Sequence, residues 1–340
     1  MRVEHVSDEE FLRYARLTSH PIPIEQSPAW DPFDASVPSR SFWRRLAVFE
    51  APADADAPPV CVVAFTHHVG NGFTYLWAKH GPIWLDEQSA RSEREVRAAL
   101  RAYITEELPA VDFVRLHAAH PAPDLCELLQ TVTYDRTVVI DLTVPAEDYL
   151  AGLAKKFRYT VRKALGHEAT TVNDETGMDA EAFAELYEIY LETAGRDGFG
   201  IFAVDVYWSM LKALAPHVRL FVARRTDGPR PGRAVAWLIA TVYDNAAVYY
   251  YAAGNAEARD TDATVRLLWD TMAVLRDEGV TQFDMMGVDS PRAPQLAGVG
   301  LFKRKWGAES TIDGAWDLPL KPWKYRSLRL ALRLKRLLRR

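Results

Sequence analysis

Hydrophobic residues in the first half of the chain recur mainly with the two-residue spacing of β-strands, between shorter stretches with helical spacing. A loop with four prolines is expected at residues 22–41, and Pro145 marks the end of the last strand. The pattern predicts a strand-rich unit with a few helices. Strands are expected at 43–49, 60–68, 73–77, 111–117 and 134–142, and helices at 8–18, 88–108 and 122–131.

The second half of the chain repeats this alternation. Helices come first, a meander of strands follows, and a last helix leads into a last strand, which is the order of a GNAT-type acyltransferase unit. Local propensity by itself predicts only a mixed α/β chain. Helices are expected at 146–165, 179–194, 204–214 and 260–278, and strands at 218–224, 233–242, 246–252 and 280–286.

Length and composition predict two globular domains in a reducing compartment. A chain of 340 residues suits two domains that each bury a core. No apolar run reaches the length of about 18 residues that a membrane-spanning helix needs, and the N-terminus lacks the apolar core of a signal peptide. Cys61 and Cys126 both lie in apolar runs, so we expect buried thiols and a cytoplasmic protein.

The charge of the chain is distributed unevenly. Residues 321–340 contain nine of the 41 Lys and Arg residues and no acid, so the first 320 residues carry 41 − 9 = 32 cations against 46 acids, a net charge of −14. Leu330, Ala331, Leu334, Leu337 and Leu338 form one stripe of this tail, and arginines form another. Such a helix suits packing on the first domain, peripheral contact with anionic lipid, or an RNA backbone.

Residues 282–309 combine the features of an anion-binding site. A predicted strand ends at Asp284 and Gly287, and a loop of small residues follows. Phe302-Lys303-Arg304-Lys305-Trp306 then places three cations between two aromatic rings. Ligands of open α/β sheets bind beyond the carboxyl ends of the strands, and rings beside cations suit nucleotides. The pattern favours a nucleotide or nucleic-acid site, although a solvated basic turn has the same composition.

This segment resembles the C-terminal signature of the Fem aminoacyltransferases. Three further segments resemble motifs of that family, in the same order along the chain. They are the strand end from Tyr75 to Gly81-Pro82, the helix Lys156-Phe-Arg158-Tyr-Thr-Val-Arg162-Lys163-Ala164, and the turn Thr193-Ala-Gly-Arg196-Asp-Gly198-Phe199. The matching C-terminal positions are Asp284, Gly287, Gly300, Phe302, Lys303, Gly307 and Glu309, with Trp306 in place of a Phe.

The resemblance implies an enzyme of cell-wall biogenesis and cell shape. Fem proteins move an amino acid from aminoacyl-tRNA to an amine of a peptidoglycan precursor. The implied fold is a mixed α/β pair of tandem GNAT-like domains without a long coiled-coil insertion, acting as a monomer. Its expected boundaries are residues 1–145 with about 307–340 on the acceptor side, and 146–306 on the aminoacyl-tRNA side.

An aminoacyl ester is already activated, so an amine can attack it directly while the enzyme stabilises the oxyanion. The resemblance makes Lys303 the candidate catalytic cation, with Phe302 orienting it or stacking on the terminal adenine. Asp284 is a candidate proton acceptor and equally suits a loop cap. Tyr251, beside an Ala-Ala-Gly turn, is a candidate for substrate contact or a core aromatic residue.

The resemblance also implies substrate and tRNA contacts, for each of which an ordinary surface or core role is the alternative. The expected substrate contacts are Trp30, Tyr75, Lys79 and Arg196. The expected tRNA contacts are Arg304, Lys305, Lys156, Arg158 and Arg162. No metal and no cofactor are expected, because the histidine pairs lack further ligands at zinc-like spacing and no Gly-x-Gly-x-x-Gly or Walker loop occurs.

The chain departs from the family after Trp30. Members that use a soluble nucleotide-linked precursor have a lysine there, whereas Asp31-Pro-Phe-Asp34 follows here, and an arginine is also missing after Gly198. Arg40, Arg44 or Arg45 could substitute. Lipid II, a small peptide and a secondary metabolite remain open as acceptors. An acyl-CoA-dependent N-acyltransferase and a non-enzymatic RNA- or membrane-binding protein are the alternative functions.

Overall fold

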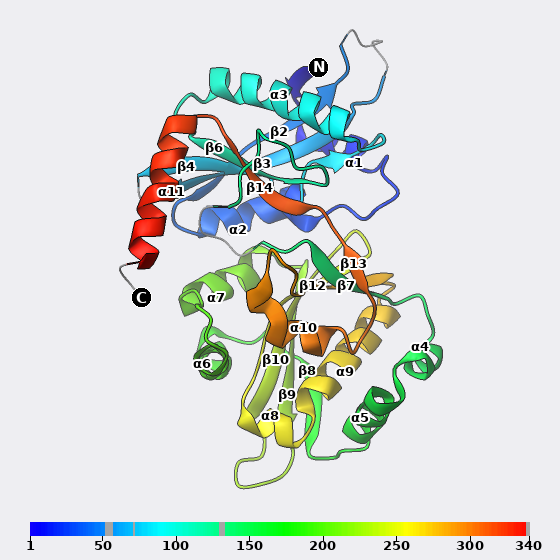
Figure 1. The fold of residues 1–340 in the computed structure, drawn as a ribbon. Coiled ribbons are helices and arrows are strands. Elements are labelled where there is room, and N and C mark those ends of the chain that lie inside the picture. The colour runs from blue at the N-terminus through cyan, green and yellow to red at the C-terminus, as the bar shows by residue number, and fades with distance from the viewer. Residues whose placement is uncertain (52–56, 71, 129–132, 338–340) are drawn as a thin grey trace. The chain divides into compact units, whose positions relative to one another are not determined.

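The computed structural model describes residues 1–51, 57–70, 72–128 and 133–337, with side chains as far as residue 334. It divides into two compact units (Figure 1). Unit 1 comprises Met1–Asp135 and Ile312–Arg340, and unit 2 comprises Arg136–Thr311. Within the described residues, no helix is both long enough and apolar enough to cross a bilayer.

Unit 1 is built on a mixed sheet in which, among the described strands, β4 and β6 run parallel and the other pairs are antiparallel. Its core joins Leu46, Val63 and Leu116 of the sheet to Val96 and Leu100 of a long helix. The strand order is β1 (Arg2–His5), β2 (Arg40–Phe49), β3 (Cys61–Gly70), β4 (Phe73–Trp77), β6 (Phe113–Ala118) and β14 (Gly314–Pro319), with β5 (Ile83–Trp84) beside β3. The helices are α1 (Asp8–Ala15), α2 (Asp31–Ser36), α3 (Ala90–Glu107) and α11 (Pro322–Leu337), with short 3-10 turns at Ile24–Gln26 and Pro28–Trp30.

Unit 2 has a second mixed sheet, in which only β11 and β12 run parallel. Its strand order is β13 (Glu309–Thr311), β7 (Arg136–Asp141), β12 (Gln282–Gly287), β11 (Ala246–Gly254), β10 (Ala234–Tyr243), β9 (Val218–Arg225) and β8 (Thr170–Asp174). The helices are α4 (Ala146–Gly152), α5 (Lys155–Leu165), α6 (Ala180–Asp197), α7 (Val204–Ala213), α8 (Ala256–Asp260), α9 (Ala263–Asp277) and α10 (Ala297–Lys303), with a 3-10 turn at Pro294–Leu296.

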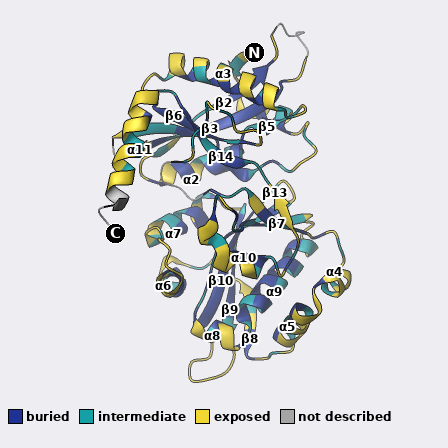
Figure 2. Cartoon of the chain, viewed as in Figure 1, coloured by how far each residue is buried: buried dark blue, intermediate teal, exposed yellow. Residues whose placement is uncertain are grey.

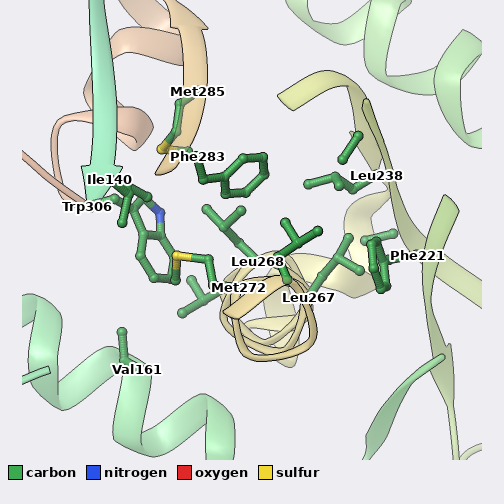
Figure 3. Close-up of a cluster of buried hydrophobic side chains, with 14 of the residues drawn as sticks. Ile140, Val161, Phe221, Leu238, Leu267, Leu268, Met272, Phe283, Met285 and Trp306 are labelled. Atoms are coloured by element: carbon green, nitrogen blue, oxygen red, sulfur yellow. The ribbon is translucent and has the colours of Figure 1, made fainter. Parts of the chain in front are cut away.

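The core of unit 2 includes the aromatic residue that ends the basic segment. Trp306 is fully buried and belongs to one cluster with Ile140 of β7, Val161 of α5 and Met272 of α9 (Figure 3). The ring of Phe157 meets its indole edge to face, with centroids 4.9 Å apart. Residues 302–306 are therefore attached to the body of unit 2 by a buried anchor, which sets the direction of the side chains around it.

The C-terminal segment returns to unit 1. Strand β14 pairs with β6, and Asp317 on β14 accepts hydrogen bonds from the buried guanidinium of Arg115 at 2.8 and 3.2 Å. Tyr325 of α11 donates to the same carboxylate at 2.8 Å and packs edge to face on Phe113. Helix α11 is thus held on unit 1 by a buried polar network as well as by apolar contact.

Most predicted strands and helices are present, with four kinds of difference. The helix predicted at 122–131 is wrong over its described part, because Cys126 instead forms an isolated bridge with Asp317; residues 129–131 lie outside the described chain. The predicted helix at 146–165 is divided into α4 and α5, whereas the helix predicted at 260–278 is present as α9, with the short α8 ahead of it. Several short elements were not anticipated, including β1, β8, β13, β14 and α10, because they are too short to show a period. The expected domain boundaries at 145 and about 307 compare with 135 and 311, because β7 and β13 pair within the unit 2 sheet.

Candidate functional site

Strands β11 and β12 separate at their carboxyl ends. In the described sheet their pairing ends at Val248 opposite Asp284. A bulge interrupts the pairing of β12 with β7 between Asp284 and Gly287, and Met286 within it has a positive φ of 59°. Backbone groups beyond this point are released from the ladder, so the end of β12 is a place where a ligand can approach the sheet.

Lys303 reaches this place from α10. Its side chain is buried, with 6% of the residue exposed, and Nζ donates a hydrogen bond to the Gly287 carbonyl at 2.9 Å. The ammonium also lies 5.8 Å from the centroid of the Tyr249 ring. Among the residues that the structure describes, no carboxylate lies within ion-pairing distance of Nζ. Lys303 is therefore a buried cation held by a carbonyl and a ring rather than by a counterion.

Burial lowers the pKa of Lys303 to about 8, and the nearby charge of Asp284 acts in the opposite direction. Desolvation disfavours the charged form of an amine, which explains the direction. The ammonium predominates at neutral pH and is lost in the mildly alkaline range. An ammonium has three N–H donors. Gly287 takes one of them, so the others can meet a ligand oxygen.

Asp284 holds the bulge together. Its Oδ1 accepts a hydrogen bond from the backbone N–H of Met286 at 2.7 Å and from the hydroxyl of Thr137. Thr137 Oγ1 also lies 3.0 Å from the Met286 carbonyl oxygen. Asp284 therefore has the loop-capping role that was its expected alternative, and the bulge that it caps orients the Gly287 carbonyl toward Lys303. A role for Asp284 as proton acceptor stays a prediction.

A close approach of two segments explains Gly300 on α10. A Cβ at this position would overlap Oδ1 of Asp289 and lie 2.9 Å from a guanidinium nitrogen of Arg304. Arg304 forms an ion pair with Asp289 at 2.7 Å and a second ion pair with Glu309. Both partners lie in unit 2, so the guanidinium predicted to contact tRNA fastens α10 to its own surroundings.

Aromatic residues line a pocket in unit 2 together with the cations Arg304 and Lys305. The pocket has a volume of about 740 Å³, and its lining includes Tyr149, Phe157, Lys305 and Trp306. Lys305 is exposed and places Nζ 5.9 Å from the Phe157 ring centroid. Lys303 is not among the lining residues. The segment therefore directs alternate cations to different places, Lys303 to the end of β12 and Lys305 to this pocket.

The predicted basic helix is present as α5, in which some cations are exposed and others are bonded within the protein. Lys156 and Arg162 are exposed. Arg158 donates a hydrogen bond to the carbonyl of Ala151, and Lys163 forms a 2.8 Å ion pair with Asp262. Lys156 and Arg162 therefore remain available for a polyanion, whereas Arg158 closes the turn between α4 and α5.

Tyr251 and Arg196 lie on the other side of β11. Tyr251 meets Tyr207 edge to face with centroids 4.9 Å apart, which agrees with the core role that was its alternative. Arg196 donates to the Gly254 carbonyl at 3.0 Å and pairs with Asp197 at 2.8 Å. The tyrosine beside Lys303 is instead Tyr249. What distinguishes them is a register shift in the pairing of β11 with β10, which lies between Tyr249 and Tyr251 and cannot be read from local sequence.

The remaining predicted contacts lie in unit 1. Lys79 Nζ lies 5.0 Å from the Trp30 ring centroid and 3.2 Å from the buried carboxylate of Glu25. Tyr75 stacks on Phe113 with centroids 4.8 Å apart. A Cβ on Gly81 would lie 2.6 Å from the side-chain amide of Gln26, whose nitrogen donates to the Lys79 carbonyl at 2.8 Å. The matched glycine thus makes room for the group that fixes Lys79.

The three arginines that could replace the missing lysine also lie in unit 1. Arg45 is buried against Asp8 and Asp31, at 2.8 and 2.9 Å. Arg44 pairs with Glu107 at 2.6 Å. Arg40 lies 3.9 Å from the buried carboxylate of Asp34, a looser contact. Of the three, Arg40 has the weakest internal partner and is the best placed to meet an external anion.

Comparison with known proteins agrees with this architecture. A profile described as an acetyltransferase (GNAT) domain matches residues 153–293. The crystal structure of FemX superposes with a TM-score of 0.73 over 97% of this chain and 100% of that chain, at 14% sequence identity. The chain has a tandem GNAT-like fold. The fold expected from the sequence is thereby confirmed.

Two other solved structures share the tandem GNAT-like fold. One is the C-terminal domain of a putative lysylphosphatidylglycerol synthetase from Agrobacterium fabrum, with a TM-score of 0.54, 12% identity, and coverage of 96% of both chains. The other is a tandem GNAT protein from the clavulanic acid biosynthesis pathway, with a TM-score of 0.53, 11% identity, and coverage of 94% of this chain and 99% of that chain. A search of curated protein sequences returns no match. Within the described residues, no group of three or more His, Cys, Asp or Glu side chains is arranged to hold a metal ion.

Proposed function

We propose that this chain is a Fem-type aminoacyltransferase that moves an amino acid from aminoacyl-tRNA to an amine of a peptidoglycan precursor. The observation that carries the proposal is Lys303, a buried ammonium without a carboxylate partner among the described residues, at the point where β11 and β12 separate. The fold shared with FemX and the matching sequence motifs support the same reaction.

The proposed reaction needs no covalent intermediate on the protein. The acceptor amine attacks the ester carbonyl carbon, a C–N bond forms, and the C–O bond to the ribose breaks. The ribose oxygen gains a proton, and the amine loses one. Lys303 supplies a fixed positive charge to the oxyanion that develops during attack, an interaction that strengthens in the transition state. Asp284 is the proposed proton acceptor, through the carboxylate oxygen that does not hold the bulge.

Backbone contacts near residue 256 disfavour the acyl-CoA alternative. A CoA pyrophosphate would need free backbone N–H groups ahead of the main helix. Here the N–H of Ala256 donates to the Glu192 carboxylate at 3.0 Å, and that of Ala258 donates to Asn255 Oδ1 at 3.1 Å. The N–H of Gly254 is taken by Thr193. These groups are already bonded, and the carboxylate of Glu192 would repel a pyrophosphate.

The acceptor that we propose is lipid II or a related muropeptide, with a small peptide or secondary metabolite as the alternative. The missing lysine after Trp30, together with the internal partners of Arg44 and Arg45, weakens the case for a soluble nucleotide-linked precursor. The acceptor would be met by residues of unit 1 near Trp30, Tyr75 and Lys79. We place the reaction in the cytoplasm, where charged tRNA is available.

A transfer assay tests the proposal. Purified protein is incubated with pooled aminoacyl-tRNAs of the host and with candidate acceptors, and the mass added to each acceptor is measured. We expect the mass of one aminoacyl residue, and Lys303→Ala should lower turnover more than tenfold because the charge that stabilises the oxyanion is lost. Lys212→Met removes an exposed cation beside Trp208 and should leave turnover unchanged.

Two outcomes would contradict the proposal. One is consumption of acetyl-CoA in the presence of amines with no use of charged tRNA, which would favour the acyl-CoA alternative. The other is undiminished turnover of Lys303→Ala, which would remove this lysine from the site.

A further inference from the structure

Helix α11 has two different apolar faces. One face packs on unit 1 through Tyr325, Leu328 and Leu332, which surround Phe113. Lys321 and Lys324 extend this attachment by pairing with the buried carboxylate of Asp112 at 3.3 and 2.7 Å. The apolar and charged groups on the inner face of α11 are therefore already packed and paired within unit 1.

The outer face carries large apolar side chains that the chain leaves in solvent. Trp323 is 80% exposed, Leu330 is 59% exposed and Leu334 is 52% exposed. Their spacing of i, i+7 and i+11 returns to one side of an α-helix, away from Tyr325, Leu328 and Leu332. Figure 2 shows α11 as a largely exposed helix along the edge of unit 1. Leu330 and Leu334 of the stripe read from the sequence thus face outward, while Leu337 and Leu338 lie beyond the described side chains. A second, unanticipated face makes the contact with unit 1.

Cations border this outer stripe. Arg326, Arg329 and Arg333 lie along one side of it, and the guanidinium of Arg326 is 5.3 Å from the centroid of the Trp323 ring. Residues 321–340 contain no acid, whereas the first 320 residues carry a net charge of −14 (32 − 46). A negatively charged surface is therefore attracted at α11 and repelled by most of the remaining chain.

We propose that the outer face of α11, formed by Trp323, Leu330 and Leu334 with Arg326, Arg329 and Arg333, binds the surface of an anionic lipid bilayer. Leucine and tryptophan side chains in the middle of the face enter the boundary between head groups and acyl chains, and the bordering arginines meet lipid phosphates. The helix lies in the plane of the interface while its inner face stays on unit 1.

The chemistry of the face favours lipid over the other occupants. An RNA backbone would satisfy the arginines but would leave the exposed leucines and the indole in water. A second copy of the chain would bury the leucines but would bring two sets of arginines together without acids between them. A bilayer with anionic head groups satisfies the apolar stripe and the cations simultaneously.

Vesicle sedimentation of the full-length chain tests this inference, without tRNA or acceptor, so its outcome does not depend on the proposed reaction. We expect binding to vesicles of phosphatidylglycerol and phosphatidylcholine and little binding to phosphatidylcholine alone. Leu330→Asp/Leu334→Asp and Arg326→Glu/Arg333→Glu should each lower the partition coefficient roughly tenfold or more. Thermal unfolding should not change, because the substituted side chains lie outside the packed face.

Two variants serve as matched controls. Leu17→Asp/Leu191→Asp places the same charges at exposed leucines elsewhere, and Arg91→Glu/Arg94→Glu makes the same change of net charge on α3. Both should bind vesicles like the unchanged protein. The inference is wrong if the unchanged protein ignores anionic vesicles, or if Leu330→Asp/Leu334→Asp binds them normally. It is also wrong if an RNA oligonucleotide displaces the vesicles from the face, or if the leucine variant abolishes a dimer that forms without lipid.

Discussion

Two lysines that the family resemblance singles out have opposite surroundings. In unit 1, Lys79 lies 3.2 Å from the buried carboxylate of Glu25 and faces the Trp30 ring. In unit 2, Lys303 is buried against the Gly287 carbonyl, with the Tyr249 ring nearby and no carboxylate at ion-pairing distance among the described residues. Both ammonium groups lie beside an aromatic ring, but only that of Lys79 is paired with a carboxylate of the described chain.

The difference shows how a fold assigns different roles to similar residues. A lysine paired with a buried carboxylate keeps that carboxylate satisfied, and its charge responds little to a ligand. A buried lysine without a counterion has a lowered pKa, about 8 for Lys303, and its charge is free to stabilise an incoming negative charge. We therefore expect changes at Lys303 to affect mainly the reaction and changes at Lys79 to affect mainly stability.

The largest expected effect is that of Lys303→Met on turnover. Aminoacyl transfer should fall more than tenfold, because a single donor to an oxyanion commonly contributes at least this much. The folded state should not lose stability, since methionine fills a similar volume without a desolvated charge. Transfer kinetics together with thermal unfolding of the variant provide the check. A variant that unfolds readily and also loses activity would indicate a structural role.

A pH profile examines the same lysine in the unchanged protein. The protonated form is lost as pH rises through about 8, so kcat/KM should fall about tenfold per pH unit above this value. The control is an acceptor-independent measurement, the far-ultraviolet circular dichroism over the same range, which should stay constant. A rate that keeps rising through pH 9 would show that the neutral amine, acting as a base, is the active form.

Stability should depend on pH in the opposite direction. The pKa of Lys303 is about 8 in the folded protein against 10.5 for an ordinary lysine, so the unfolded chain binds more protons between these values. The free energy of unfolding should therefore rise from pH 8 to pH 10.5 by on the order of 3 kcal/mol relative to Lys303→Met. Denaturant titrations of both proteins across this window measure the difference. Parallel curves would mean that the lysine is not desolvated.

Lys79→Met should give the reverse signature. Removing the ammonium leaves the buried Glu25 carboxylate without its lysine, which should lower the free energy of unfolding by about 1–2 kcal/mol. The measurement is denaturant unfolding at neutral pH. Glu25→Gln with Lys79→Met should recover much of the loss, because the neutral pair leaves no charge unpaired. A failure of this rescue would argue that Lys79 acts on a ligand instead.

The smallest expected effect is that of Lys305→Ala. Lys305 is exposed at the pocket beside Phe157 and has no carboxylate partner among the described residues, so it suits a tRNA phosphate. We expect the KM for tRNA to rise by about threefold to tenfold and to depend less steeply on salt, while kcat stays unchanged. Arg304→Ala should instead destabilise α10, because its partners Asp289 and Glu309 belong to the protein.

Residue patterns predicted most residues of the candidate site but not its geometry. Lys303, Phe302 and Asp284 were identified through motif resemblance, and the strands around them follow from alternation of apolar residues. Tyr251 was the tyrosine expected at the site, but the tyrosine beside Lys303 is Tyr249. Simple alternation would place both side chains on one face of β11, and only the register shift in its pairing with β10, between Tyr249 and Tyr251, separates them.

The sequence by itself determined two α/β units, the cation-rich segment at 302–306 and the basic amphipathic tail, because periodicity, charge and motif spacing are local properties of the chain. Tertiary structure decided which cation is buried without a counterion and which face of α11 is covered. Those outcomes depend on contacts between distant residues, such as Thr137 with Asp284 and Arg115 with Asp317. Burial and pairing of charges are set by these long-range contacts, so identical side chains in one short segment acquire different chemistry.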